Sequence, residues 1–277
     1  MLKQRILTAV VLLALLIPAL VAGATWPFAL LTLAGMTIAG WEWVRLNDGG
    51  AFAVPAAALL ALACALALFA GWTTAAPHAS WWVAFGLWVL GGTWALRKGV
   101  AGWPKVPRAL RWLIGLAALW TAWLAFSNAK AGGLNFILSV FTLVWAADIF
   151  AYFGGRRFGR RKLAPAISPG KSWEGVWSGM AGALLVAVGW LAVDASGSLG
   201  GESFYTLVAN RFGHAGLALV VVFLVAMSVV GDLFESLVKR AAGAKDSSRL
   251  LPGHGGVLDR IDALLPVLPI AMALITP

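Results

Sequence analysis

The sequence has few charged residues and a single cysteine. Only 12% of its 277 residues are Asp, Glu, Lys or Arg, against roughly a quarter in an ordinary soluble domain. Because 61% of the residues are hydrophobic, the chain has too little polar surface for a water-soluble globule. Cys64 lies in an apolar stretch, which excludes an intramolecular disulfide and a cysteine-based metal site. Nucleic acid is excluded as a partner, since a chain this apolar has no soluble basic face despite its net charge of +10.

Long apolar runs and tryptophan are abundant instead. The mean hydropathy is +0.87, and the 16 Trp residues are of a type that favours the membrane–water interface. A bilayer core needs about 20 helical residues to cross it. We therefore expect an all-α, polytopic integral membrane protein with nine spans, at approximately residues 6–22, 26–43, 51–71, 80–96, 112–128, 134–153, 176–193, 215–231 and 261–276.

The distribution of basic residues predicts the orientation of these spans. Lys and Arg near span ends accumulate on the cytoplasmic side. With nine spans, 19 of the 21 Lys and Arg fall on the side that contains the N-terminus. We therefore expect a cytoplasmic N-terminus and an outside C-terminus, in the cytoplasmic (inner) membrane of a bacterium or in an organellar membrane.

The chain shows no long linker, so we expect one integral membrane domain over residues 1–277. Residues 1–133 carry few motifs, whereas residues 134–277 carry most of the charged ones. The first apolar run also resembles a secretory signal, with Lys3 and Arg5 before it and small residues after it. Its length and its place in the charge alternation favour a retained span.

A first charged cluster follows the sixth expected span. Asp148 lies near the end of this span, where a carboxylate is costly and usually faces a polar cavity, and Tyr152 is one turn further on. Arg156 begins a basic segment, and Ser168 and Lys171 precede the next helix, where backbone N–H groups and a cation can bind phosphate. A stop signal or an anionic-lipid patch is an open alternative for the basic residues.

A second cluster continues from the eighth expected span. If the helix extends beyond the membrane, one of its faces is polar and the other is apolar. A solvated face is the simple interpretation, but Asp232 lies where the span is still expected to be partly buried. The polar face comprises Asp232, Glu235, Ser236, Lys239 and Arg240.

A glycine-rich turn then leads to two more carboxylates. His254-Gly255-Gly256 carries little side chain, so backbone can approach a ligand closely. Asp259 and Asp262 follow at a spacing that places them on one helix face. Carboxylates are the natural protein ligands of Mg²⁺, which fills its remaining positions with water and substrate phosphate. The sequence therefore predicts a divalent-metal site here, with helix capping by Asp259 as the alternative.

These clusters resemble the signature of the phosphatidate cytidylyltransferase (CDP-diacylglycerol synthase) family. The resemblance covers residues 145–262, and the preceding part is similar only in being polytopic. One departure is Ile149-Phe150, where smaller residues are expected. The matching residues are Asp148, Ala151-Tyr152, Gly155-Arg156, Gly159-Arg160, Leu163-Ala164-Pro165, Ser168-Pro169, Lys171-Ser172-Trp173-Glu174-Gly175, Ser236, Lys239-Arg240, Lys245-Asp246, Pro252, His254-Gly255-Gly256, Asp259-Arg260 and Asp262.

The resemblance implies a Mg²⁺-dependent reaction of phosphatidate with the α-phosphorus of CTP at the cytoplasmic face. It assigns Mg²⁺ to Asp232 and Asp259, with Asp246 and Asp262 in support, and leaves a second cation open. It assigns phosphate contacts to Lys171, Lys239, Arg240 and Lys245. Ser168 and His254 would orient the substrate or donate hydrogen bonds to it. Arg156 would contact the phosphate of the nucleotide or of the lipid. Asp148 and Asp246 join the nucleotide-phosphate site.

Other functions stay open at this stage. A CTP-dependent polyprenol or phytol kinase would use the same nucleotide but transfer the γ-phosphoryl group. An anion transporter would suit Asp148, but it would place its site near the membrane midplane. The Asp-Gly-x-x-Ala-Arg pattern of the CDP-alcohol phosphotransferases is absent from the sequence. The expected partners are CTP, phosphatidate and the bilayer, and a homodimer is compatible with the sequence.

Overall fold

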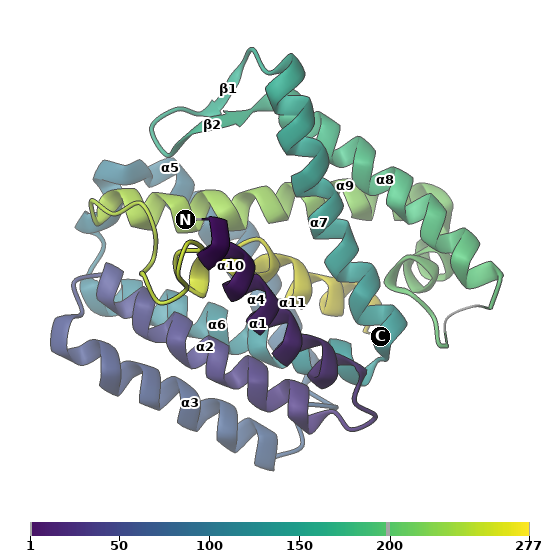
Figure 1. The fold of residues 1–277 in the computed structure, drawn as a ribbon, viewed down its shortest axis with the longest axis horizontal. Helices are drawn as coiled ribbons and strands as arrows, with labels where there is room; N and C mark the ends of the chain where they lie inside the picture. The colour runs from purple at the N-terminus through teal and green to yellow at the C-terminus, as the bar shows by residue number, and fades with distance from the viewer. Residues whose placement is uncertain (1, 198–199, 277) are drawn as a thin grey trace.

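A computed structural model describes residues 2–197 and 200–276 as a bundle of helices with one small hairpin (Figure 1). The first part of the chain is helical throughout, interrupted by short turns. Its elements are α1 (Leu2–Val21), α2 (Trp26–Leu46), η1 (Gly50–Phe52), α3 (Ala53–Phe69), α4 (His78–Gly86), the π-helical segment η2 (Leu87–Gly92), α5 (Thr93–Gly102), η3 (Trp103–Lys105) and α6 (Arg108–Ala131).

The second part contains the longest helices and the only hairpin of the described chain. The hairpin lies beside the end of α7 and the start of α8, at the top of the view in Figure 1. Within α9, Gly213 has a positive φ of 72°, so this helix is kinked there. The elements are α7 (Leu134–Phe158), β1 (Lys162–Ala164), β2 (Ser168–Ser172), α8 (Trp173–Ala195), α9 (Phe204–Ala241), α10 (Leu258–Ile261) and α11 (Leu264–Ile275).

Seven of the described helical segments are long and apolar enough to cross a membrane. They expose many large apolar side chains, including Leu59 on α3 and Leu185 on α8, as expected where lipid replaces water. An all-α polytopic membrane protein is thereby confirmed. Two of the nine predicted spans fall outside these seven. The helix α2 has 21 residues but includes Glu42 and Arg45, and α11 has only 12 residues, so the span count stays a prediction.

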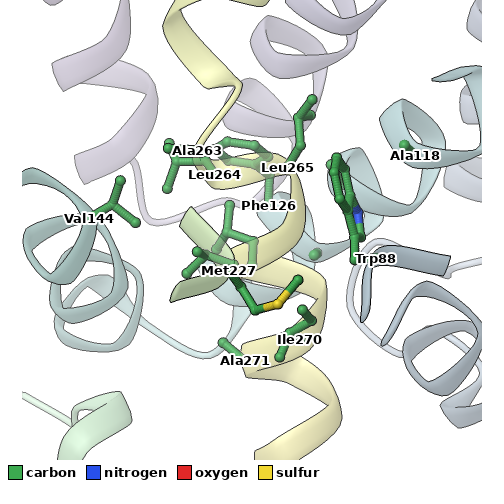
Figure 2. Close-up of a cluster of buried hydrophobic side chains, with 14 of the residues drawn as sticks. Trp88, Ala118, Phe126, Val144, Met227, Ala263, Leu264, Leu265, Ile270 and Ala271 are labelled. Carbon is green, nitrogen blue, oxygen red and sulfur yellow. The ribbon is translucent and has the colours of Figure 1, made fainter. Parts of the chain in front are cut away.

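The short helix α11 forms the centre of the bundle. Its residues 264–271 are all buried, and it contacts α4, α6, α7 and α9. Figure 2 shows Leu264, Leu265 and Ile270 among Phe126 of α6, Val144 of α7 and Met227 of α9. A helix that is apolar on all sides belongs in such a position. The break at residues 262–263 separates α11 from α10. The helix α11 therefore begins at Leu264, three residues later than the predicted ninth span.

The helices α7 and α8 pack closely because small residues face each other. A Cβ atom on Gly179 would lie 2.7 Å from the backbone oxygen of Ala147, and one on Gly154 would lie 2.0 Å from Ser178 Oγ. Small residues permit such close approach between membrane helices. Ile149 and Phe150, which depart from the family pattern, are both partly exposed. The Phe150 ring nevertheless packs against α8, since a Cβ on Gly182 would lie 2.2 Å from it, so a glycine of α8 accommodates this large side chain.

Polar contacts between elements gather at two opposite ends of the bundle. At one end, Thr8 of α1 bonds to Pro252, and Lys239 near the end of α9 bonds to Asp259. At the other end, Arg211 near the start of α9 bonds to the backbone oxygen of Thr276. The first helix therefore begins at the end that contains Asp259, and Thr276 lies at the opposite end. Which end faces the cytoplasm stays a prediction.

Candidate active site

A pocket of about 490 Å³ lies between α7, the hairpin, α8 and α9. This volume falls in the range of small-molecule sites. Its wall is partly apolar, from residues such as Ala147, Val176 and Val225, and partly charged. The structure brings together five of the predicted site residues in this lining, which are Asp148, Arg156, Ser168, Lys171 and Asp232.

The charged groups of the pocket come from three different elements. Lys171 Nζ, on β2, lies 2.7 Å from Asp232 Oδ2, on α9, and both side chains are about one-third exposed. Asp148, on α7, is close enough to interact electrostatically with both of them. Ser236 Oγ, one turn beyond Asp232, donates to Asp232 Oδ1 at 3.3 Å. The pocket thus presents carboxylates and a cation that retain access to a ligand.

The hairpin and the start of α8 close one side of the pocket. Ser172 caps α8, since its hydroxyl accepts a hydrogen bond from the N–H of Gly175 at 3.2 Å. Glu174 accepts bonds from the backbone N–H groups of Arg160 and Arg161 and from the Arg161 guanidinium. These contacts fix the hairpin to the helix. Lys171 and the α8 N-terminus are therefore held at the same place, as the sequence predicts for a phosphate site.

Arg156 lies at the exposed side of the pocket. Its Nη1 donates to the hydroxyl of Tyr152 at 3.2 Å, one turn earlier on α7. This contact is exposed, and Arg156 lines the pocket, so the guanidinium is accessible to an anion there. Arg156 is thus placed where the sequence expects a contact with nucleotide or lipid phosphate.

Asp259 lies in a second, closed cluster beside the pocket. Its Oδ1 accepts from Lys239 Nζ at 2.6 Å, and its Oδ2 accepts from the Ser247 backbone, the Ser247 hydroxyl and the Gly256 backbone at 2.9, 2.9 and 2.7 Å. Burial acts to raise the pKa of Asp259, but contacts with Glu235 and Lys239 and these backbone bonds hold it below its usual range. Both carboxylate oxygens are thereby engaged.

Lys239 joins this closed cluster to α9. It contacts Glu235 one turn earlier as well as Asp259, and its side chain is only 11% exposed. The polar face of α9 is therefore buried against residues 245–259 at Glu235 and Lys239, and the simple interpretation of a solvated face is wrong there. Charged side chains that are buried in this way must be paired with opposite charges, because burial removes their hydration.

Glu42 of α2 is the main site residue that the sequence analysis did not single out. Its side chain is fully buried and accepts hydrogen bonds from Ser247, Ser248, Val257 and Leu258. A signal for it was present, since Glu42 is a carboxylate inside an apolar run, and the argument applied to Asp148 applies equally to it. Its partners lie over 200 residues away, and no local spacing indicates them.

Glycine is required where the turn before Asp259 meets these carboxylates. Gly255 has a positive φ of 82°, and a Cβ there would lie 2.5 Å from Asp259 Oδ2. A Cβ on Gly256 would lie 2.2 Å from Glu42 Oε1. The close approach predicted for this turn is therefore an approach to the protein's own carboxylates.

Other predicted site residues lie outside the pocket lining. Lys245 and Asp246 are exposed on the segment after α9. Arg240 bonds to the backbone oxygens of Ile167 and Ala244, which ties the hairpin to that segment. His254 is half-buried, and its backbone N–H bonds to Leu251. These four residues surround the closed cluster, and their assigned roles stay predictions.

Acidic side chains near the pocket could hold Mg²⁺. Within residues 2–197 and 200–276, no three His, Cys, Asp or Glu side chains are grouped as metal ligands. Mg²⁺ commonly uses only one or two protein carboxylates when phosphates complete its shell. Asp148 and Asp232 line one pocket, and Asp262 interacts electrostatically with both. This donor set fits a Mg²⁺ ion bound together with a nucleotide.

Comparisons with known proteins agree with this chemistry. The model of the cytidylyltransferase family matches residues 3–276. A phosphatidate cytidylyltransferase of Pseudomonas aeruginosa is 42% identical over an alignment of 287 positions, which covers 99% of this chain and 97% of that protein. The Haemophilus influenzae protein of the same name is 53% identical over 50% of this chain and 44% of its own length. The chain described here belongs to the cytidylyltransferase family.

Proposed function

We propose that the pocket between α7, α8 and α9 is the active site of a phosphatidate cytidylyltransferase. The enzyme is a nucleotidyltransferase that converts CTP and phosphatidate into CDP-diacylglycerol and pyrophosphate, the activity named in its bacterial relatives. The observation that supports this location is the Lys171–Asp232 ion pair, which is partly exposed and lines the same pocket as Asp148.

The reaction joins two anions, so charge neutralisation is the main task of the site. A phosphate monoester has a second pKa near 6 and is already a nucleophile at neutral pH, so no general base is required. Its oxygen attacks the α-phosphorus of CTP, and the bond from that phosphorus to the bridging oxygen of pyrophosphate breaks. Lys171 and Arg156 neutralise the phosphates, and Ser168 orients them by hydrogen bonding.

Asp148 and Asp232 would hold Mg²⁺ in this pocket, with Asp262 close by. When bound, Mg²⁺ would supply charge neutralisation at the phosphate oxygens. In the structure Asp232 pairs with Lys171, so a ligand phosphate would compete for the same lysine. Asp259 would have to release Lys239 before its Oδ1 could bind a cation. We therefore propose Asp232 as the principal metal ligand, with Asp148 beside it in the pocket, and Asp259 as a supporting ligand.

The apolar part of the pocket suits a lipid substrate. Small and aliphatic residues of α7, α8 and α9 line it beside the charged groups. We propose that the phosphatidate headgroup enters from the bilayer and that the active site faces the cytoplasm, as the charge distribution of the loops predicts. The inner membrane is then the location in a bacterium. A homodimer stays a prediction.

Product analysis tests the proposed reaction. Purified protein is given phosphatidate, Mg²⁺ and CTP labelled at the α-phosphate, and the lipids are separated by thin-layer chromatography. We expect label in a CDP-lipid. Label that stays in water-soluble nucleotide would contradict the proposal, and transfer from γ-labelled CTP to polyprenol would favour the kinase alternative.

A matched pair of lysines on the hairpin tests the location. Lys171 on β2 lines the pocket, whereas Lys162 on β1 is exposed on the neighbouring strand. We expect Lys171→Gln to lose most of the transfer activity and Lys162→Gln to retain it. Equal losses in the two variants would contradict the location.

A further inference from the structure

We propose that Glu42, on α2, is a positioning residue that fixes the segment carrying Ser247 and Gly256 and, through it, the Asp259 carboxylate. This inference deepens the proposed function and rests on its active site. It also gives the first part of the chain, which carries few motifs, a direct role in the geometry of that site.

The surroundings of Glu42 fit a structural anchor for this segment. Its side chain is fully buried. Oε1 accepts from Ser248 Oγ at 2.5 Å and from the N–H of Val257 at 3.0 Å, and Oε2 accepts from Ser247 Oγ at 3.1 Å and from the N–H of Leu258 at 2.8 Å. One carboxylate thus holds both ends of the 247–258 segment. Buried carboxylates are retained only with such a full set of donors.

The segment passes this constraint directly to Asp259. Ser247 Oγ lies 3.1 Å from Glu42 Oε2 and 2.9 Å from Asp259 Oδ2, so a single hydroxyl, with one proton to donate, is shared between the two carboxylates. The backbone N–H groups of Ser247 and Gly256 donate to the same Asp259 oxygen. Gly256 leaves no room for a Cβ between Ser247 Oγ and Glu42 Oε1. A shift of Glu42 therefore shifts three of the four donors that hold Asp259.

The end of α2 is itself rigidly held, as an anchor requires. Trp43, beside Glu42, donates from its indole N–H to the backbone oxygen of Arg111 at 2.9 Å. Arg45 donates to the backbone oxygen of Ser247. The position of the anchor is therefore fixed by α6 and by the segment itself, and Glu42 cannot move without breaking these contacts.

The first test uses Ser248→Ala, which removes a donor to Glu42 without touching Asp259. We expect kcat to fall about threefold to tenfold with KM for CTP and phosphatidate nearly unchanged, because the binding pocket is intact. Thr37→Ala is the matched control, since Thr37 lies on the same helix and its hydroxyl bonds to the backbone oxygen of Leu33 one turn earlier. An unchanged kcat in Ser248→Ala, or an equal fall in the control, would overturn the proposal.

The second test is a double-mutant cycle of Glu42→Gln and Ser247→Ala. If Glu42 acts through Ser247, the double variant loses about as much kcat as the more severe single variant. Losses that multiply would overturn the proposed route. Only protein that elutes as a single folded species in detergent is compared, and Ser248→Ala serves as the milder variant if Glu42→Gln does not fold.

Limited trypsin digestion supplies a readout that does not depend on activity. Arg249 is exposed near the start of the held segment. We expect faster cleavage after Arg249 in Glu42→Gln and Ser248→Ala than in the wild type or Thr37→Ala. Unchanged cleavage would overturn the anchor. If the wild-type protein lacked cytidylyl transfer, the proposed function would fail while the digestion would still test Glu42.

Discussion

The open pocket and the closed cluster use the same residue types in opposite ways. In the pocket, Asp232 and Lys171 are paired but about one-third exposed. In the closed cluster, Asp259 has both oxygens engaged by donors, and Lys239 is nearly buried between two acids. Charges that keep space around them are available to a ligand, whereas fully bonded charges hold the protein together. The two regions should therefore respond differently to substitution.

The largest effect is expected from Asp232→Asn in the pocket. We predict a fall in kcat of about 10² to 10³, the scale for loss of one electrostatic contact to a developing or transferred charge. The thermal midpoint should change little, since the side chain is partly exposed and its ion pair contributes little to stability. Steady-state kinetics and a thermal melt of the same preparation measure both. A variant that unfolds instead would remove the distinction between the two regions.

Lys239→Met should produce the complementary result in the closed cluster. The substitution leaves Glu235 and Asp259 without the cation that both contact. Removing one partner of a buried charge group costs about 3 to 5 kcal/mol. We predict a large loss of thermal stability and of folded yield. Thermal melting in detergent measures the first, and size-exclusion chromatography measures the second. Wild-type stability with lost activity would show that Lys239 belongs functionally to the pocket.

A pair of glycines sharpens the comparison. A Cβ on Gly256 would meet Ser247 Oγ and Glu42 Oε1 at 2.1 and 2.2 Å, whereas a Cβ on Gly170, in the pocket wall, meets nothing within 4 Å. We predict that Gly256→Ala destabilises the protein by about 1 to 3 kcal/mol. Gly170→Ala should be neutral for stability. Equal melting temperatures for the two variants would argue that the closed cluster is not tightly packed.

The smallest effect is expected from Arg156→Gln at the exposed side of the pocket. Its contact with Tyr152 is exposed. We therefore expect KM for CTP or phosphatidate to rise a few-fold, with kcat nearly unchanged. The difference from wild type should shrink at high salt, because exposed charges are screened. Kinetics at low and high salt measure this, and a salt-independent loss of kcat would place Arg156 in direct contact with the reacting groups.

The sequence predicted those features that depend on local pattern. Apolar run length predicted the helices, and the cost of a carboxylate in a membrane segment singled out Asp148 and Asp232, which the structure brings to one pocket. Glu42 was missed because its four donors lie far along the chain. The shortness of α11 was also missed, since its burial on all sides depends on four other helices. Tertiary contacts of this kind leave no periodic signal.

Substrate protection of a cysteine in the pocket tests the central claim most directly. Cys64 is the only native cysteine and is buried, so Ser168→Cys introduces one accessible thiol in the pocket lining and Lys162→Cys introduces one on the neighbouring strand. If the pocket binds the nucleotide, CTP with Mg²⁺ will slow maleimide labelling of Ser168→Cys and leave Lys162→Cys unaffected. Labelling of an active Ser168→Cys enzyme at the same rate with and without saturating CTP would contradict the account.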